Sequence, residues 1–374
     1  MKPVRDRSVP APAHLEGLDR YEPGMSIEQV QREQGLADVV KLASNENPLG
    51  PSPLALEAAR QALGSIHRYP DGAGTVLRAK LAARLGVLEE QVTLGNGSSD
   101  LIDLLARAYL SPGDNAVIAE RGFARFRQSV NSRNRGARLV PMRAHTHDLE
   151  AMREACDART RLLFVANPNN PTGTWNARRE FDALLSRLPK GVLVVLDEAY
   201  FQFAQDEPDY PNGLDFVASG APVAVLRTFS KAYGLAGLRI GYAVAAPETI
   251  AALDTVREPF NTGSLGQLAA HAALDDHQHV SKSLALNRTQ KARLEAELRG
   301  RGLGVLPSLG NFLCVEMYRD GGLVFRRLIE HGVIVRPLQA YDLPSHLRIS
   351  VGAPAEIDRL LAALDSVLLE IPRA

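Results

Sequence analysis

The stretch Thr228-Phe-Ser-Lys231-Ala-Tyr-Gly-Leu-Ala-Gly-Leu-Arg239-Ile-Gly241 decides the fold of this chain. It follows an apolar run, residues 223–226, and leads into a second apolar run, residues 240–245. A short run rich in valine and leucine that ends in polar residues is typical of a buried parallel strand. In open α/β sheets the active groups gather at the carboxyl ends of such strands. The stretch therefore predicts an α/β fold with Lys231 at that edge of the sheet.

Two earlier segments repeat this arrangement. The run Gly-Val-Leu-Val-Val-Leu ends in Asp197-Glu-Ala-Tyr200, and the run Leu-Leu-Phe-Val-Ala-Asn ends in Pro168-Asn-Asn170-Pro-Thr-Gly173. Because the carboxyl ends of parallel strands meet at one edge of a sheet, we expect a single site. It would hold a lysine, an aspartate, a tyrosine, an asparagine and an arginine: Lys231, Asp197, Tyr200, Asn170 and Arg239.

This set of side chains suits pyridoxal 5′-phosphate (PLP). A lysine amine forms a Schiff base with an aldehyde, and PLP uses that bond to become an electron sink. A buried Asp197 would keep the pyridine nitrogen protonated, while Tyr200 and Asn170 would donate an O–H and an N–H to the phenolate oxygen. The hydroxyl groups and guanidinium that the phosphate needs lie close to Lys231: Thr228, Ser230 and Arg239. Each residue alone fits a solvated loop, a helix cap or a turn, but their order and intervals together favour the cofactor.

The chain resembles the fold-type I aminotransferases that depend on PLP, and within them it is most similar to the histidinol-phosphate aminotransferase family. The resemblance runs from Tyr21-Glu-Pro-Gly to Leu347-Arg-Ile-Ser-Val-Gly352. The motifs around Asn170, Asp197 and Lys231 are highly specific for PLP. The marks of the narrower family are less exclusive: Ser44-Asn-Glu-Asn-Pro48, Arg68-Tyr-Pro-Asp71 and the C-terminal arginines.

Strand and helix patterns alternate from residue 92 onward, which predicts a mostly parallel sheet covered by helices on both faces. Beyond about residue 262 a long helical stretch, residues 265–299, precedes shorter strands and a final helix. With the resemblance, this predicts a fold-type I PLP-dependent transferase: a large domain with a mostly parallel sheet between helices, and a smaller C-terminal α+β domain. We divide the chain into an N-terminal arm and segment packing on the small domain (1–45), a large PLP-binding domain (46–262) and a small domain (263–374).

Composition narrows the class of protein further. The 374 residues are 45% hydrophobic and 23% charged with a net charge of zero, which predicts a soluble globular protein that binds neither nucleic acid nor an anionic membrane. Two distant cysteines without histidines at ligand spacing favour neither a disulfide nor a metal site. The first ten residues lack an apolar region, so we expect a cytoplasmic protein.

The segment Gly95-Asn-Gly-Ser-Ser-Asp100 opens a predicted helix directly after a predicted strand. Its backbone N–H groups suit an anion, although a glycine turn with Ser98 or Ser99 as the N-cap fits equally well. By resemblance, these two serines bind the cofactor phosphate and Phe123 stacks on the ring, where the alternative is a core phenylalanine. Tyr69 matches a tyrosine that reaches the cofactor of the neighbouring subunit, so the resemblance implies a homodimer with shared active sites.

The resemblance implies transamination of L-histidinol phosphate with 2-oxoglutarate, giving imidazole acetol phosphate and L-glutamate in histidine biosynthesis. Lys231 would anchor the cofactor and act as general acid and base, with Asp197 and Tyr200 as further catalytic residues. Four residues would contact the substrates: Tyr21, Asn47, Arg336 and Arg348. Arginine suits both anions because its planar fork pairs bidentately with phosphate or carboxylate; arginines at strand ends and a tyrosine at the rim are the ordinary alternatives.

One segment departs from the family's pattern, Arg121-Gly-Phe-Ala-Arg125-Phe126-Arg127. The family usually has proline and small residues around the stacking aromatic, followed by tyrosine. Phe126 lacks a phenolic hydroxyl, and Arg125 adds a cation close to the cofactor. Three alternatives therefore stay open: an aminotransferase for aromatic or other amino acids, a PLP-dependent decarboxylase of the phosphothreonine type, and, last, a PLP-binding regulator.

Overall fold

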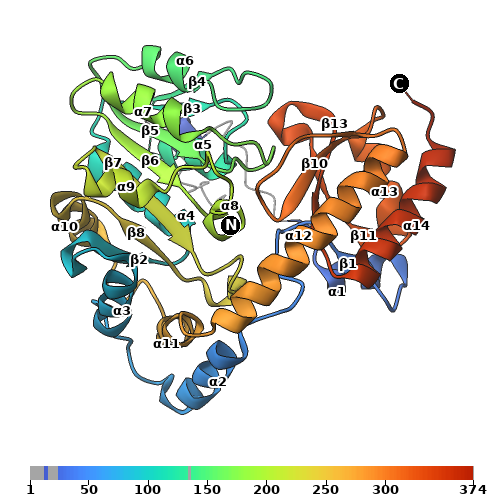
Figure 1. Cartoon of the computed structure of the whole chain (residues 1–374), viewed down its shortest axis with the longest axis horizontal. Coiled ribbons are helices and arrows are strands. Elements are labelled where there is room, and N and C mark those ends of the chain that lie inside the picture. The colour runs from blue at the N-terminus through green and yellow to red at the C-terminus, as the bar shows by residue number, and fades with distance from the viewer. Residues whose placement is uncertain (1–11, 16–23, 134–135, 374) are drawn as a thin grey trace, which may run out of the picture.

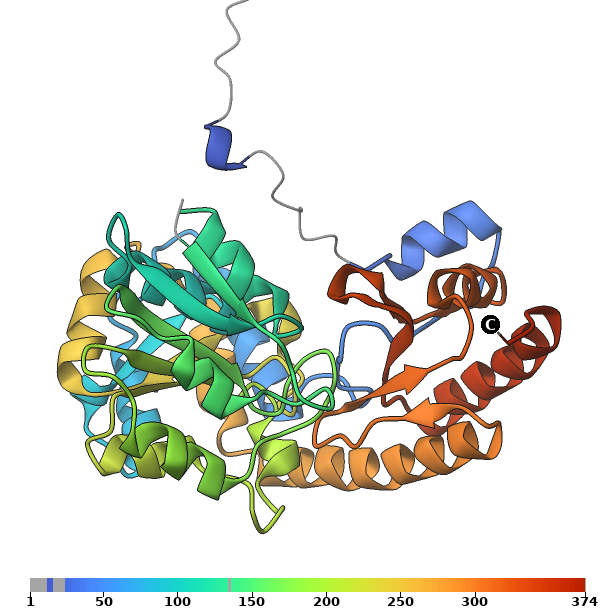
Figure 2. The same ribbon diagram turned by 90° about the horizontal axis from the view of Figure 1, so that it is seen from above.

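The computed structural model describes residues 12–15, 24–133 and 136–373, which form two bodies of unequal size (Figure 1). The large body is built on a seven-stranded sheet and the small body on a four-stranded sheet. Helix α12 (His277–Gly300) starts beside the large body and runs along the small one in both views (Figures 1 and 2). Within the described ranges no helix is both long enough and apolar enough to cross a membrane.

The large sheet carries its strands in the order β2-β8-β7-β6-β5-β3-β4. The bounds of these strands are β2 (Val92–Gly95), β3 (Asn115–Ala119), β4 (Gly136–Val140), β5 (Thr160–Ala166), β6 (Leu193–Asp197), β7 (Val223–Thr228) and β8 (Gly241–Val244). The five strands from β7 to β4 run parallel, whereas β8 is antiparallel to both of its neighbours. The predicted mostly parallel sheet is therefore confirmed, and the ends of β5, β6 and β7 lie side by side.

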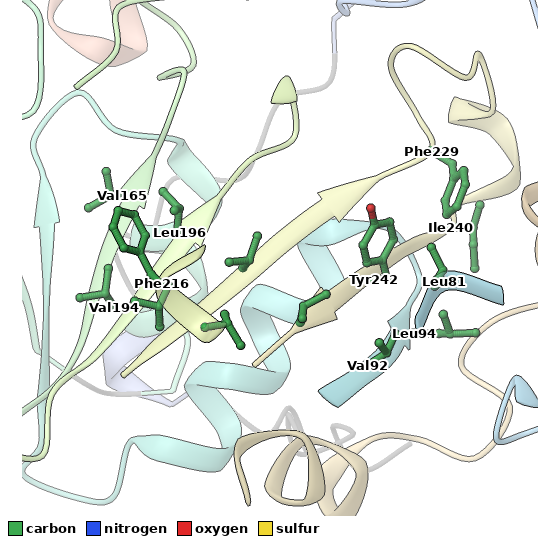
Figure 3. Packing of buried hydrophobic residues seen from close by; sticks show 14 of the residues in the cluster. Leu81, Val92, Leu94, Val165, Val194, Leu196, Phe216, Phe229, Ile240 and Tyr242 are labelled. Carbon is green, nitrogen blue, oxygen red and sulfur yellow. The ribbon is translucent and has the colours of Figure 1, made fainter. Parts of the chain in front are cut away.

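Helices cover both faces of this sheet: α2 (Pro53–Ala62), α3 (Thr75–Leu85), α4 (Ser98–Tyr109), α5 (Ala124–Asn131), α6 (Leu149–Glu154), α7 (Arg178–Ser186), α8 (Phe201–Ala204), α9 (Gly213–Ala218), α10 (Pro247–Val256) and α11 (Ser264–Ala273). Successive residues of a strand point to opposite faces, so β5 serves two apolar cores. Val165 packs with α7 and α9 on one face, where Figure 3 shows it near Phe216, and Phe164 packs with α4, α5 and α10 on the other. A strand buried on both faces reads as an unbroken apolar run, which explains the sequence pattern.

The small body has an antiparallel sheet in the order β12-β13-β10-β9. Its elements are α1 (Ile27–Gln34), β1 (Val40–Lys41), β9 (Gly304–Val305), β10 (Phe312–Glu316), α13 (Gly321–Glu330), β11 (Val333–Ile334), β12 (Arg336–Leu338), β13 (Leu343–Ser350) and α14 (Pro354–Glu370). Strand β1 pairs in parallel with β11, so a segment from the start of the chain is part of this body. The chain then crosses to the large body through residues 43–46, which border both.

The sequence pattern predicted one helical stretch over residues 265–299, but the structure has two helices there, α11 and α12. The prediction of a continuous stretch was wrong. The chain turns at Leu274–Asp276, and Asp276 caps α12 by accepting a hydrogen bond from the His279 amide at 3.0 Å. Ala269 and Ala270 of α11 belong to the core of the large body. The apolar packing thus places α11 with the large sheet, while the proposed division into domains stays a prediction.

Candidate active site

A cavity of about 440 Å³ lies between the two bodies, at the carboxyl ends of β5, β6 and β7. Its opposite wall comes from residues 43–46 and from strands β12 and β13 of the small body. The cavity brings together twelve of the predicted site residues: Ser98, Ser99, Phe123, Asn170, Asp197, Tyr200, Thr228, Ser230, Lys231, Arg239, Arg336 and Arg348.

Lys231 follows β7 and projects into the cavity. Its Nζ donates a hydrogen bond to the Ser44 carbonyl oxygen at 3.1 Å and lies 5.8 Å from the centre of the Tyr200 ring. Burial, together with the positive charge of Arg348, lowers the pKa of this amine to about 8. A lysine with this pKa is neutral in an appreciable fraction of molecules near pH 7, as a nucleophile or general base must be.

Asp197 is the last residue of β6 and is buried. The Ala199 amide donates to its Oδ1 at 3.0 Å, but burial raises the pKa of the carboxyl to about 7, with a contribution from Glu198. Glu198 itself points the other way, into a buried ion pair with Arg227 at 2.7 Å. The two adjacent carboxylates therefore differ: one is structural, and the other faces the cavity where a cation would stabilise its charged form.

The first turn of α4 forms a cradle for an anion. Its N-cap is Gly97, with φ of 77° and no side-chain cap, so the alternative with Ser98 or Ser99 as the N-cap is wrong. A Cβ on Gly97 would stand 2.7 Å from Arg239 Nη2, so glycine is what allows this guanidinium to lie against the turn. The uncapped N–H groups at a helix start and the guanidinium together attract an anion.

Hydroxyl groups complete this cradle. Thr228 Oγ1 donates to Ser230 Oγ at 2.9 Å, and the Arg239 Nη1 lies 3.5 Å from the same oxygen. Thr228 is the last residue of β7, Ser230 lies two residues further on, and both are buried. The chemistry of this group of donors fits a phosphate.

Arg348 of β13 reaches across from the small body. Its Nη1 donates to Asn170 Oδ1 at 2.5 Å and its Nη2 donates to the Ala43 carbonyl oxygen at 2.5 Å. The Nε atom is buried and has no hydrogen-bond partner among the described residues. Both hydrogen bonds go to uncharged oxygen atoms, so the positive charge remains available to an anionic ligand. Arg336, at the start of β12, lines the same wall.

Phe123 lines the cavity at the start of α5 and meets Phe126 edge to face, with ring centres 5.8 Å apart. Phe126 is fully buried and stacks on Phe164 at 4.9 Å, so it belongs to the core. Arg125 does line the cavity, where it forms an ion pair with Asp103. The unusual segment thus adds a cation to the wall, but one that a carboxylate already balances.

Two of the predicted residues that the structure describes do not line the cavity. The Asn47 side chain donates to the Ala232 carbonyl oxygen and to Ser283 Oγ, both at 2.9 Å, so its contact with the substrate stays a prediction that the cavity lining does not support. Tyr69 is 83% exposed and stacks on Phe260 with ring centres 4.6 Å apart, outside its own chain's cavity. Tyr21 lies outside the described residues.

Asn45 is a cavity residue that the sequence prediction missed. It belongs to the same motif as Asn47, but it is buried, has φ of 54°, and donates from Nδ2 to the Tyr200 hydroxyl at 2.9 Å. Asparagine is among the few residues that adopt the left-handed region readily. The sequence gives no sign of which asparagine of the motif faces the cavity.

Comparison with known proteins agrees with this geometry. The family model for aminotransferase class I and II matches residues 37–364. The chain is similar to histidinol-phosphate aminotransferase 2 of Pseudomonas aeruginosa, with 50% identity over 356 residues, 95% of this chain and 96% of the relative. It is also similar to histidinol-phosphate aminotransferase 1 of Nitrosococcus oceani, with 45% identity over 96% of this chain and 97% of the relative. A crystal structure of histidinol-phosphate aminotransferase from Sinorhizobium meliloti in complex with PLP matches with a TM-score of 0.88 and 31% identity, over 98% of this chain and 99% of that one.

Proposed function

The chain belongs to the aminotransferase class I and II family, and we propose that it transfers the amino group of L-histidinol phosphate to 2-oxoglutarate. The products are imidazole acetol phosphate and L-glutamate, and the reaction serves histidine biosynthesis. The observation that carries the proposal is Lys231, which lines a cavity together with Asp197 and two arginines from the small body. The relatives from Pseudomonas aeruginosa and Nitrosococcus oceani support the substrate, because they are histidinol-phosphate aminotransferases that are 50% and 45% identical to this chain over almost its whole length.

The side chains of the cavity fit PLP. The cradle at the start of α4 offers uncapped N–H groups, hydroxyl groups and a guanidinium to a phosphate, and buried Asp197 offers a carboxylate to a ring cation. When bound, PLP supplies an electron sink for the carbon that carries the substrate's amino group. In our proposal Phe123 covers the ring, and five residues hold the phosphate: Ser98, Ser99, Thr228, Ser230 and Arg239.

Lys231 and Asp197 are the charged catalytic groups in this proposal. Lys231 is the covalent anchor, and its amine, with a pKa lowered to about 8, moves a proton as general acid and base. Asp197 keeps the pyridine nitrogen protonated, because a cation facing a buried carboxylate stabilises its charged form. Tyr200 and Asn170 donate hydrogen bonds to the phenolate oxygen.

The two arginines of the small body recognise the anionic substrates. Arg348 and Arg336 line the wall that the small body contributes to the cavity. A guanidinium binds a phosphate monoester and a carboxylate equally well through its planar fork. The same pair can therefore serve histidinol phosphate in one half-reaction and 2-oxoglutarate in the other. Tyr21 remains a proposed contact to the substrate phosphate.

A homodimer with shared active sites is part of the proposal. Tyr69 and its neighbours Leu63 and Ile66 are 83%, 53% and 63% exposed, and Phe260, on which Tyr69 stacks, is 43% exposed. Large apolar side chains exposed together are unusual on a monomer. A second copy of the chain would cover them and would receive the Tyr69 hydroxyl at its cofactor phosphate.

The experiment that tests the function is a half-reaction screen. Cofactor-loaded protein is mixed with one amine at a time, without 2-oxoglutarate, and the absorbance of the cofactor is followed. We expect histidinol phosphate to react fastest and dephosphorylated histidinol to react about 10–100-fold more slowly, because it loses charge-assisted contacts of roughly 1–3 kcal/mol.

Two outcomes would contradict the substrate. Phenylalanine or tyrosine reacting faster than histidinol phosphate would identify an aminotransferase for aromatic amino acids. Release of CO2 from phosphothreonine, with no need for 2-oxoglutarate, would identify a decarboxylase instead.

A further inference from the structure

The short segment that crosses between the two bodies contacts three groups of the cavity. The Ala43 carbonyl oxygen accepts from Arg348, the Ser44 carbonyl oxygen accepts from Lys231, and the Asn45 side chain donates to Tyr200 Oη. The first two contacts use only the backbone. Asn45 is therefore the one residue of these three whose side chain determines the contact.

The small body holds Asn45 by its backbone on both sides. The Asn45 amide donates to Ser350 Oγ of β13 at 2.8 Å, and the Asn45 carbonyl oxygen accepts from Asn311 Nδ2 at 3.0 Å. Asn45 and Ser350 are 1% and 3% exposed. Asn45 has a left-handed φ of 54°, and its side-chain nitrogen meets Tyr200 of the large body.

The hydrogen bonds around Ser350 fix which end of the Asn45 amide faces Tyr200. Ser350 Oγ already accepts from the Asn45 backbone N–H, and its single hydrogen is donated to Asn45 Oδ1 at 2.9 Å. The amide nitrogen, which can only donate, is therefore the end that meets Tyr200 Oη. Because Tyr200 Oη accepts in this bond, the hydrogen of its own hydroxyl is left for another acceptor.

That acceptor has to come from the cavity. Asn45 is the only hydrogen-bond partner of the Tyr200 hydroxyl within the described ranges, and Tyr200 lines the cavity wall. Burial raises the pKa of the Tyr200 phenol to about 12, so the hydroxyl keeps its hydrogen at neutral pH. We propose that Asn45 is a positioning residue that fixes the Tyr200 hydroxyl as a hydrogen-bond donor into the cavity, toward the phenolate oxygen of the cofactor. The inference rests on the proposed binding of PLP but not on the identity of the amine substrate.

The test is the variant Asn45→Asp, which replaces the side-chain amide nitrogen by an oxygen and so reverses the direction of the hydrogen bond to Tyr200. In Asn45→Asp the new oxygen can only accept, so it takes the Tyr200 hydrogen away from the cofactor, and aspartate tolerates the left-handed backbone. The readout is the pH midpoint of the absorbance change of the bound cofactor, measured on loaded protein without substrate. Loss of a donor to the phenolate oxygen raises that midpoint, by about one pH unit for one hydrogen bond to a charged acceptor.

A double-mutant cycle separates this effect from the added negative charge. We expect Asn45→Asp and Tyr200→Phe each to raise the midpoint, and Asn45→Asp to add nothing when Tyr200 is already phenylalanine. An equal shift in both backgrounds, or no shift in either, would overturn the inference and leave the proposed function intact. Wild-type protein without any pH-dependent cofactor absorbance would overturn both.

Ser350→Ala provides a second route should Asn45→Asp not fold. It removes the hydroxyl that fixes the Asn45 amide and changes no charge. We expect Ser350→Ala to raise the midpoint less than Asn45→Asp does when Tyr200 is present, and not at all in the Tyr200→Phe background. An unchanged midpoint in the single variant would contradict the inference.

Discussion

Two partly buried lysines of this chain share a lowered pKa but have different surroundings. Burial lowers the pKa of both Lys231 and Lys291 to about 8. Lys231 faces Asp197, Tyr200 and a phosphate cradle in the cavity between the bodies. Lys291, on α12, donates to the carbonyl oxygens of Ser308 and Gly310 at 2.7 and 3.3 Å.

The contrast shows that a lowered pKa alone does not identify an active site. Lys291 also borders a hollow, of about 240 Å³, whose wall carries Asp206 and Glu207. Neither carboxylate of its described lining is buried as Asp197 is. What makes Lys231 catalytic in our account is the set of groups around it, and the following predictions test that difference.

The largest expected effect separates the two lysines directly. Lys231→Ala should abolish the half-reaction with histidinol phosphate, a loss of about 10⁴-fold or more, because it removes both the covalent anchor and the general acid and base. Lys291→Met should leave the rate within a few-fold of wild type. Single-turnover absorbance measurements decide between them, and comparable losses in the two variants would contradict the contrast.

The variant Asp197→Asn tests the buried carboxylate that shares the cavity with Lys231 and has no counterpart beside Lys291. An amide cannot hold the pyridinium proton by charge, so the single-turnover rate should fall about 10²–10³-fold, as when other preorganised electrostatic groups are removed. The fold should survive, since the Ala199 amide can still donate to the side-chain oxygen. Near-normal turnover would mean that Asp197 only caps the start of the next segment.

Arg348→Lys tests the anion wall on the far side of the cavity. Lysine keeps the charge but loses the planar fork, so the half-reaction with histidinol phosphate should slow about 10–100-fold, corresponding to roughly 1–3 kcal/mol. Arg336→Lys should act in the same direction. Dephosphorylated histidinol serves as the control, because its already low rate should change less; an equal change for both amines would argue against phosphate recognition by these arginines.

Tyr69 tests whether the Lys231 cavity is completed by a second copy. Subunits carrying Tyr69→Phe and Lys231→Ala together are mixed with wild-type subunits, and heterodimers are compared with those carrying Lys231→Ala alone. The intact Lys231 site should lose up to about tenfold in activity when its partner lacks the tyrosine hydroxyl, the contribution of one hydrogen bond to a charged group. Identical activities per intact site would refute a shared site.

Lys291 should contribute to the pH dependence of the unfolding free energy. Its pKa is lowered on folding, from 10.5 to about 8, so between these values the unfolded chain binds more protons and stability rises with pH. Lys291→Met lacks this contribution. The unfolding free energy of wild type, measured in urea, should therefore gain about 1–3 kcal/mol over the variant between pH 8 and 10.5. Parallel pH profiles would show that Lys291 is not buried as described.

Most of the cavity could be predicted from the sequence, because the residues of its large-body wall lie close to strands that the apolar pattern identifies. Asp197, Asn170 and Lys231 each stand within a few residues of the end of an apolar run, so strand order brings them to one edge. Asp197 was assigned to the cofactor, but the apolar run alone does not separate it from Glu198, which pairs with Arg227, since the two carboxylates are adjacent at the end of the same run. That choice depends on which side of the sheet each side chain takes.

The small-body side depends on contacts between distant parts of the chain. Whether Asn45 or Asn47 faces the cavity is decided by Ser350 and Asn311, 305 and 266 residues further along than Asn45. The break between α11 and α12 likewise depends on Asp276, which bonds Ser52 Oγ at 2.7 Å as well as capping its helix. The helical spacing of the apolar residues continues across this break, so the sequence pattern does not show where α11 ends and α12 begins.

The central claim, that the cofactor is anchored on Lys231 and on no other lysine, is tested most directly by reduction of the loaded protein with borohydride and mass mapping of its peptides. We expect a single pyridoxyl-modified peptide, the one that contains Lys231, and an unmodified peptide around Lys291. Modification of Lys291 or another lysine instead of Lys231 would contradict the account.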